Sequence, residues 1–302
     1  MTLGTNVFAA QYVAIQNKAE SMIGTGSGTL GYGQTVQSSD VFSGNLITKA
    51  QWDLIKYDII NIKLHQDGII PPVVTVNFGD PIGYGAGSPN TNYNTLLDDA
   101  LAKRFLVSNS QAVVTAKTSQ TYSTPWSTQA QATLTVTFGD ANQGRYFFNS
   151  GGKVRFTASL VGAVITPQIT AWVNFLSSVG TVSFGADTDP AINYYTLTNS
   201  YQTYYQSFLS SSYSANSYKL EARTNVSNNS TGTATVLELR ISLLDSYVDP
   251  DVAFGASFPP ADVVNGTLTI AVSELKASGQ LQPSGTFSIT SPSYSLSSIT
   301  AS

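Results

Sequence analysis

Two periods of hydrophobic residues divide the sequence near residue 115. Before that point, apolar side chains recur every three or four residues, as on one face of an α-helix, in segments separated by glycine-rich loops. From about Thr121 onward they alternate with polar residues at every second position, as in a half-buried antiparallel strand. The pattern predicts a mainly β protein, with an α-containing N-terminal region over residues 1–115 and a β domain over residues 116–302.

Three helices are predicted in the N-terminal region. The strongest follows Thr48, which has capping-box spacing with Gln51, so that each side chain satisfies a free backbone donor of the other residue. Gly68 ends this helix. Its apolar residues recur at helical spacing: Trp52, Ile55, Ile59 and Ile62. Weaker periods predict helices over about residues 6–22 and 95–107.

The β domain is predicted from alternating segments such as "ATLTVTFG", "KVRFTASL", "YKLEART", "TVLELRISLL" and "GTLTIAVSEL". Short runs of this kind, bounded by Gly, Asn, Ser and Pro, favour an antiparallel β-sandwich of jelly-roll-like type. One helix interrupts them after Thr166, because Pro167 suits a first helical position and apolar residues follow at helical spacing. We expect this short helix to pack on the sandwich.

The segment "TFGDANQGRYFFNSGGKVRFT" at residues 137–157 places glycines between aromatic runs. A nucleotide-binding loop runs from a strand into a helix, whereas these glycines are interpreted as joining strand to strand. We therefore predict that "GDANQG" and "NSGG" are turns and that "RYFFN" is the strand between them, since glycine adopts positive φ without steric cost.

The amino-acid composition excludes several classes of function. Only 11% of the 302 residues are charged, against roughly 25% in an ordinary soluble domain, so hydroxyl and amide groups make most of the polar surface. A net charge of −4 and a pI near 4.9, without a Lys/Arg cluster, argue against nucleic-acid binding. The absence of cysteine excludes thiolate chemistry, and no run of 18 apolar residues predicts membrane insertion.

Candidate catalytic residues are few. His65 is the only histidine, so one chain has no multi-histidine metal site, and we interpret it as a capping or packing residue. A metal site formed by His65 from three copies of the chain on a symmetry axis remains an alternative. Aspartates cluster at 98–99, at 187 and 189, and at 245, 249 and 251, where calcium binding or glycosidase chemistry stays open beside a turn-forming role. We predict no enzyme activity, cofactor or metal.

The segment "INYYTLTNSYQTYYQSFLSSSYSANSY" is unusually rich in tyrosine. Tyrosine combines a large contact area with a hydrogen-bonding group, which suits carbohydrate or protein binding. Alternating Tyr and Thr are also good strand formers, which is the simpler interpretation. The candidate interaction surface consists of Tyr194, Tyr195, Tyr201, Tyr204 and Tyr205.

Several longer stretches resemble virion structural proteins of tailed cyanobacterial phages, chiefly contractile-tailed ones. The N-terminal stretch contains "GTGSG", "GYGQ" and an I-T-x-x-Q-W-D helix that ends in HQ-x-G, a pattern that recurs in that family. "NQGRYFFNSGGKVRF", "SSVGTVSFGA", "YYTLTNSYQTYY" and "GTLTIAVSELKASG" are similar too, so the resemblance extends over nearly the whole chain. It implies no catalytic residue.

The resemblance implies a non-enzymatic virion component of neck, tail-fibre or appendage type. Such proteins are usually symmetric oligomers, so we expect a homotrimer that contacts other phage particle proteins, with residues 1–115 as the attachment part. A second hypothesis is a receptor-binding module that uses the tyrosines to bind a host surface glycan. A third is a polysaccharide depolymerase, which would need two of the aspartates, such as Asp187 and Asp249.

Overall fold

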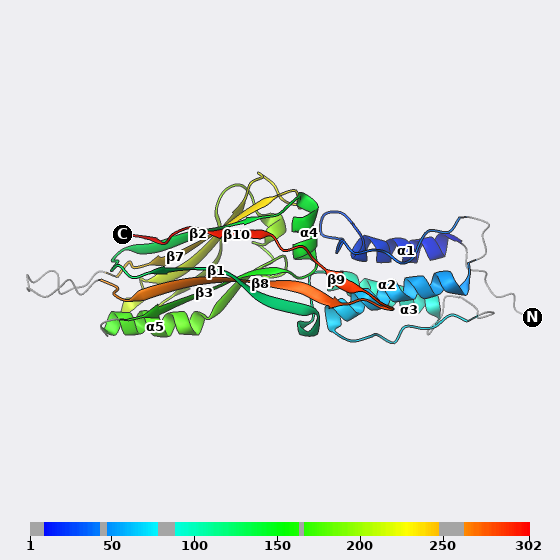
Figure 1. The fold of residues 1–302 in the computed structure, drawn as a ribbon, viewed down its shortest axis with the longest axis horizontal. Coiled ribbons are helices and arrows are strands. Elements are labelled where there is room, and N and C mark those ends of the chain that lie inside the picture. Colours follow the sequence, from blue (N-terminus) through cyan, green and yellow to red (C-terminus); the bar gives the residue numbers. More distant parts are fainter. Residues whose placement is uncertain (1–8, 43–46, 78–87, 163–165, 248–262) are drawn as a thin grey trace, which may run out of the picture.

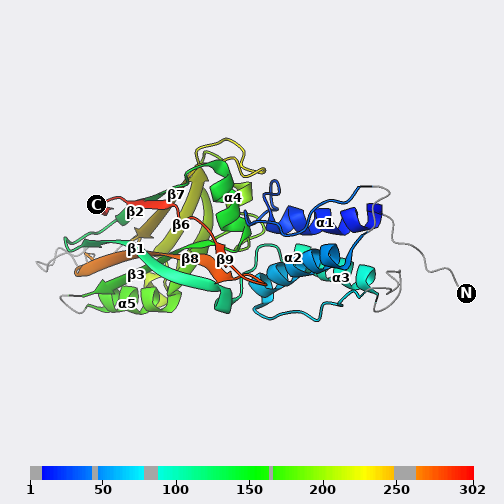
Figure 2. The same ribbon diagram turned by 45° about the vertical axis from the view of Figure 1, so that its right-hand side comes forward.

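The protein is an elongated body with helices at one end and β-sheets at the other (Figure 1, Figure 2). This computed structural model describes residues 9–42, 47–77, 88–162, 166–247 and 263–302. Three helices form the end where the chain starts, and two antiparallel sheets form the end where it finishes. The prediction of a mainly β fold with an α-containing N-terminal region is confirmed.

The helical end contains α1 (Ala9–Ile23), α2 (Lys49–Asp67) and α3 (Pro89–Ala102). The predicted capping box starts α2: the Thr48 hydroxyl accepts from the Gln51 amide, and the Gln51 side chain accepts from the Thr48 amide at 2.8 Å. Both free donors are therefore satisfied before the first turn is complete.

The third helix starts and ends earlier than its apolar period predicts. Ser88 caps it by accepting from the Thr91 amide, and Pro89 occupies the first turn, where its missing N–H costs nothing. The three helices meet at the buried Trp52, whose ring packs edge-on against Tyr12 at 5.3 Å and Tyr93 at 5.6 Å between centroids.

The β end has two antiparallel sheets, with strand orders β1-β8-β3-β4 and β10-β2-β7-β6-β5; β9 pairs with β8, and β11 pairs with β2. The strands are β1 (Ala112–Tyr122), β2 (Gln129–Thr137), β3 (Lys153–Val161), β4 (Thr181–Phe184), β5 (Gln202–Phe208), β6 (Ser217–Thr224), β7 (Val236–Leu244), β8 (Thr267–Gln280), β9 (Thr286–Ser288), β10 (Ser293–Leu296) and β11 (Thr300–Ala301).

The two sheets enclose the core with alternate residues, as the period of two predicts. In β2, Leu134 and Val136 are fully buried while their neighbours are partly exposed or exposed, and β3, β7 and β8 alternate in a similar way. The sandwich is jelly-roll-like where β1 pairs with β8 and β2 with β7. It departs from that order where β3 and β5 pair with their sequence neighbours, β4 and β6.

The predicted helix after Thr166 is α5 (Pro167–Val179), which packs along β3 (Figure 1). The Thr166 hydroxyl accepts from the Ile169 amide at 3.2 Å and so caps the helix. Trp172 faces inward, where its ring meets Trp126 edge-on at 5.5 Å.

The prediction of a strand over "RYFFN" is wrong, because these residues lie in α4 (Ala141–Asn149). Asp140 caps this helix by accepting from the Gln143 amide at 2.8 Å, and the following apolar residues then fall on one helical face. The "NSGG" stretch consequently ends a helix instead of joining two strands: Gly151, at φ 79°, donates its amide to Phe148 O and turns the chain into β3.

A C-terminal hairpin joins the two ends of the molecule. β8 runs out of the sandwich, and β9 returns beside the helices (Figure 1, Figure 2). Phe287 of β9 is 2% exposed and stacks on the His65 ring, with 4.3 Å between centroids and 4° between planes. Two hydrogen bonds attach the turn of the hairpin to α2: the Asn61 side chain accepts from Gln282 N at 2.6 Å and donates to Gln282 O at 3.0 Å.

Replacing Phe287 with alanine tests whether this hairpin holds the two ends together. We expect the Phe287→Ala protein to lose about 3–5 kcal/mol of unfolding free energy, the usual cost of emptying a buried phenylalanine site. Denaturant titration of the full chain measures it. Phe42→Ala, which truncates a phenylalanine that is 75% exposed, is the matched control and should change stability by about 0.5 kcal/mol or less. Equal effects of the two changes would contradict the assignment.

Candidate functional site

The aspartates proposed from the sequence are engaged in local structure. Asp187 forms an ion pair with Lys153 at 2.9 Å, and Asp189 accepts from the amides of Ala191 and Ile192, as a turn-forming aspartate does. Asp245 accepts from the buried Gln168 side chain at 2.7 Å. Within the described residues, no three His, Cys, Asp or Glu side chains are grouped so that they could hold a metal ion. Positions 249 and 251 lie outside the described residues.

The pair of aspartates on α3 takes part in an ion network with α2. Asp98 lies 3.0 Å from Lys18 of α1, and Asp99 contacts both Lys63 and Lys103. The two lysines hold the pKa of Asp99 below its usual value, through hydrogen bonds first and charge second. These carboxylates connect three helices and lie on the outside of the helical end.

His65 lies inside the molecule, between the rings of Phe287 and Tyr32. Burial lowers its pKa to about 3, because the apolar surroundings disfavour the imidazolium; the backbone of Ser150 acts more weakly in the opposite direction. The imidazole is therefore neutral at physiological pH and functions as an aromatic packing group. Its burial within one chain also removes it from any site shared between three copies.

The predicted tyrosine surface is divided by the fold. Tyr194 and Tyr195 lie in a short 3-10 helix (Tyr194–Thr196) and are buried, so they are not part of an exposed surface. Tyr201, Tyr204 and Tyr205 lie at β5 and are partly exposed. Sequence alone did not separate the two groups, because tyrosine suits a core and a surface equally well.

The buried Tyr195 belongs to a polar junction between α4 and the glycine-rich loop after α1. Its hydroxyl lies within hydrogen-bonding distance of two acceptors, Asn149 Oδ1 at 2.5 Å and Gly28 O at 3.0 Å. Arg145 donates to three carbonyls of the same loop, at distances of 2.9 to 3.1 Å: those of Thr25, Gly28 and Leu30. The loop that contains "GTGSG" and the helix that contains "NQGRYFFN" thus form one structural unit through hydrogen bonds between residues 115 or more positions apart.

Glycine is required where this loop passes α4. Gly33 has φ 68°, and a Cβ atom there would lie 2.4 Å from the Tyr146 ring. Asn149 completes the junction by donating to Leu30 O and Gly31 O at 3.0 and 3.1 Å. The loop carbonyls face side-chain donors of α4, so "GTGSG" has a structural role that its composition did not reveal.

Tyr201 is the most strongly engaged of the exposed tyrosines. Its ring lies under the guanidinium groups of Arg240 and Arg223, at 3.9 and 4.5 Å, and its hydroxyl donates to Glu238 at 2.9 Å. The same carboxylate accepts from Arg223, so the charges around the ring are compensated.

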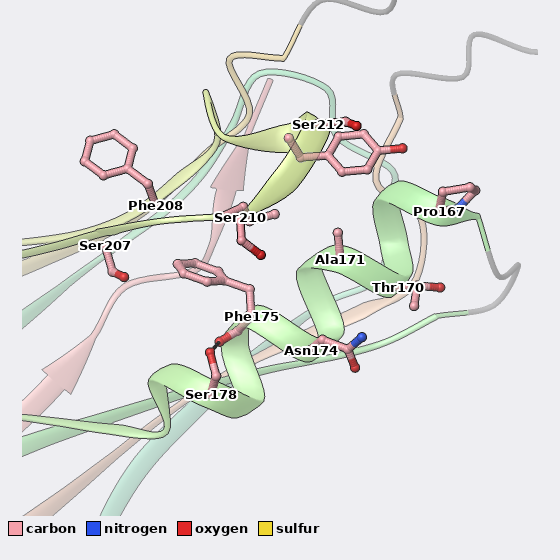
Figure 3. Close-up of a pocket in the computed structure, with 12 residues that line it drawn as sticks. Pro167, Thr170, Ala171, Asn174, Phe175, Ser178, Ser207, Phe208, Ser210 and Ser212 are labelled. Carbon is pink, nitrogen blue, oxygen red and sulfur yellow. Dashed lines mark hydrogen bonds between the residues drawn. The ribbon is translucent and has the colours of Figure 1, made fainter.

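A groove of about 730 Å³ lies between α5 and the segment 207–213, which ends β5 and continues into a 3-10 turn (Figure 3). Ala171 and Phe175 point from the helix toward that segment (Figure 3). The groove is lined by Pro167, Thr170, Ala171, Asn174, Phe175, Ser178, Ser207, Phe208, Leu209, Ser210, Ser212 and Tyr213. Sequence analysis did not find it, although Thr170, Asn174 and Ser178 recur at one helical spacing, opposite Trp172.

Comparison of the chain with models of protein families, with curated proteins and with solved structures finds no match. Among the described residues, no helix combines the length and the apolar character needed to cross a membrane.

The pH dependence of stability tests the neutral, buried state of His65. The unfolded chain takes up a proton on this residue as pH falls through about 6.5, whereas the folded protein does so only near pH 3. Stability contributed by His65 is therefore complete above pH 6.5 and is lost as pH falls toward 3. Denaturant titrations between pH 7 and 4 should show that the unfolding free energy of the unchanged protein falls with pH. In His65→Phe the slope of unfolding free energy against pH should be smaller by the equivalent of about one proton.

The His65→Phe protein isolates His65 from Asp58, whose pKa is raised by burial and whose contribution changes with the opposite sign. Asp58 is unchanged in this variant and serves as an internal reference. Parallel curves for the two proteins would contradict a buried neutral imidazole.

Proposed function

We propose that the protein is a non-enzymatic structural component of a tailed phage particle, of neck, fibre or appendage type, and that it acts as a homotrimer. The proposal rests on the resemblance to cyanobacterial phage virion proteins and on one structural observation. The helices and the sandwich form a single elongated body, because the β8–β9 hairpin and the α4 junction connect them. A body of this form suits a protein that holds a fixed position between neighbours in an assembly.

Several exposed apolar residues lie within about six residues, along the chain, of the point where the two ends meet. There the Ser108 amide donates to His65 O at 2.9 Å, just before β1 begins. We name this set the apolar waist: Ile69, Ile70, Leu106, Val113 and Val114. Val113 and Val114 lie on β1, which ends the strand order of its sheet among the described strands. An exposed apolar edge strand favours association with another chain.

The apolar waist supports self-association, because covering such side chains removes apolar area from water. The partners proposed are two further copies of the chain and other particle proteins, with the helical end as the attachment part and the virion as the location. No role for nucleic acid or for membrane insertion is proposed, since the net charge is −4 and the described basic side chains are mostly paired with carboxylates.

Light scattering coupled to size exclusion tests the oligomer. We expect a mass near three times 32.0 kDa for the full chain, stable over a range of concentrations. Val114→Asp should shift the mass toward a single chain, because a buried unpaired carboxylate opposes assembly. Val161→Asp alters a valine that is 71% exposed at the other end of the molecule and should leave the mass unchanged. A single-chain mass for the unaltered protein at every concentration would contradict self-assembly.

Immunogold electron microscopy tests the location. An antibody raised against the purified chain should label particles of the phage that encodes it, at the neck or at a fibre. Preincubation of the antibody with the purified chain is the control and should abolish the label. Particles that bind no antibody, intact or disrupted, and that yield no peptides of this chain in mass spectrometry would overturn the proposal. Intact protein is preferable to a deletion of residues 1–115, which would expose Phe287 and confuse attachment with folding.

A further inference from the structure

The groove beside α5 has a composition that the structural role does not explain. Its helical wall presents Pro167, Thr170, Ala171, Asn174 and Ser178, which recur along one face of α5, outside the buried Trp172 face. A chain with 11% charged residues has uncharged faces elsewhere too, so the hollow beside this face is what singles it out. This face has hydroxyl, amide and small apolar groups beside a hollow.

The opposite wall repeats the same chemistry. Ser207, Ser210 and Ser212 line it from β5 and the turn that follows, and the buried Leu209 lies between them. Each serine hydroxyl donates one hydrogen bond and accepts others, so this wall can meet both donors and acceptors of a ligand. Asn174 provides the same two capacities from the helix, whereas the Thr170 hydroxyl, which donates to Thr166 O at 2.9 Å, provides an acceptor.

Aromatic rings supply the apolar part of the groove. Phe175 is almost fully buried and points from α5 toward segment 207–213, and Tyr213 belongs to the turn that follows β5. Phe208 is 58% exposed at the end of β5, and its ring projects from the side of the strand away from α5 (Figure 3). The face of an aromatic ring carries partial negative charge and attracts the weakly positive C–H groups of a ligand. A ligand that has both C–H faces and many hydroxyl groups matches this lining.

No Asp, Glu, Lys, Arg or His lines the groove among the described residues. An anionic ligand would therefore lose hydration without meeting a positive side chain, and the chain's net charge of −4 adds general repulsion. A purely apolar ligand would leave the hydroxyl and amide groups of both walls unpaired. The volume of about 730 Å³ lies within the range of roughly 300–1,000 Å³ that is usual for small-ligand sites.

We propose that the groove between α5 and segment 207–213 binds a neutral oligosaccharide. Sugar C–H faces pack on the aromatic lining of Phe175 and Tyr213. Sugar hydroxyls exchange hydrogen bonds with Asn174 and the serines of the opposite wall, and donate to the Thr170 hydroxyl. This is a binding activity beyond the structural role, and it differs from the tyrosine surface predicted from sequence, since Tyr194 and Tyr195 are buried elsewhere.

A glycan array probed with the full chain tests the proposal. The array should contain neutral glucose, galactose and mannose oligomers beside oligosaccharides that carry uronic or sialic acids. We expect retention on one or more neutral oligomers and none on their acidic counterparts. Titration calorimetry with the retained oligomer then gives a dissociation constant for the chain and its variants.

Two variants and one matched control locate the binding. Ala171→Trp fills the groove without removing a polar contact, and Asn174→Ala removes an exposed amide; each should weaken binding at least tenfold. Ser177→Trp adds the same bulky ring to an exposed position of α5 that does not line the groove, and it should bind as the unchanged chain does. Circular dichroism and melting temperature confirm that all three are folded.

Four results would overturn the proposal: no retention of any neutral oligomer, retention of acidic glycans alone, equal affinity of Ala171→Trp and Ser177→Trp, or a loss of oligomer mass in Ala171→Trp. The last result would identify the groove as a contact between copies of the chain. The oligomeric state of the unchanged chain is measured separately, so failure of glycan binding is distinguishable from failure of the structural role.

Discussion

The contact between Phe287 and His65 is the interaction on which the shape of the molecule depends. It places a residue near the C-terminus against a helix from the first quarter of the chain, with ring planes that differ by 4°. Without it, β8 and β9 would extend from the sandwich as an isolated hairpin, which is marginally stable in water. Because the ring stack and the Asn61–Gln282 hydrogen bonds act on the same hairpin, the helices and the sheets have one fixed arrangement.

Side-chain amide groups form many of the long-range hydrogen bonds in this protein, at places where other proteins use ion pairs. Asn149 and Asn61 each join segments more than 100 residues apart, and Gln34 pairs in both directions with the backbone of Ser288. A neutral amide has both donors and acceptors, and its burial costs far less than that of a charge. This explains how a chain with 11% charged residues fixes its long-range contacts. It also explains the buried Arg145: its nitrogens donate to the glycine-rich loop and to Asn142, and none of these bonds has a carboxylate as its acceptor.

The surfaces proposed to contact partners also contain few charged side chains. The residues of the apolar waist follow α2 or lie at and before the start of β1, and the groove lies beside α5, on the sheet end of the molecule. A surface that has few ions requires little desolvation when it is covered, whether by another copy or by a neutral ligand. Because the two sites lie on different elements, the proposed structural role and the proposed ligand binding are compatible.

Local features of the sequence determined α2, α5 and the alternating strands, because caps such as Thr48 and Thr166 and the periods that follow them act within a few residues. The lone histidine and the absence of cysteine likewise limited the chemistry through residue type alone, whatever the fold. The helix over "RYFFN" also has a local signal, the Asp140 cap, which the prediction of a strand overlooked. Only the tertiary structure decided that Tyr194 and Tyr195 are buried while Tyr201 is not, and that a groove lies beside α5. Each of these depends on partners distant in the chain, as when the Tyr195 hydroxyl reaches Gly28 O, and neither period nor composition records which distant segments will meet.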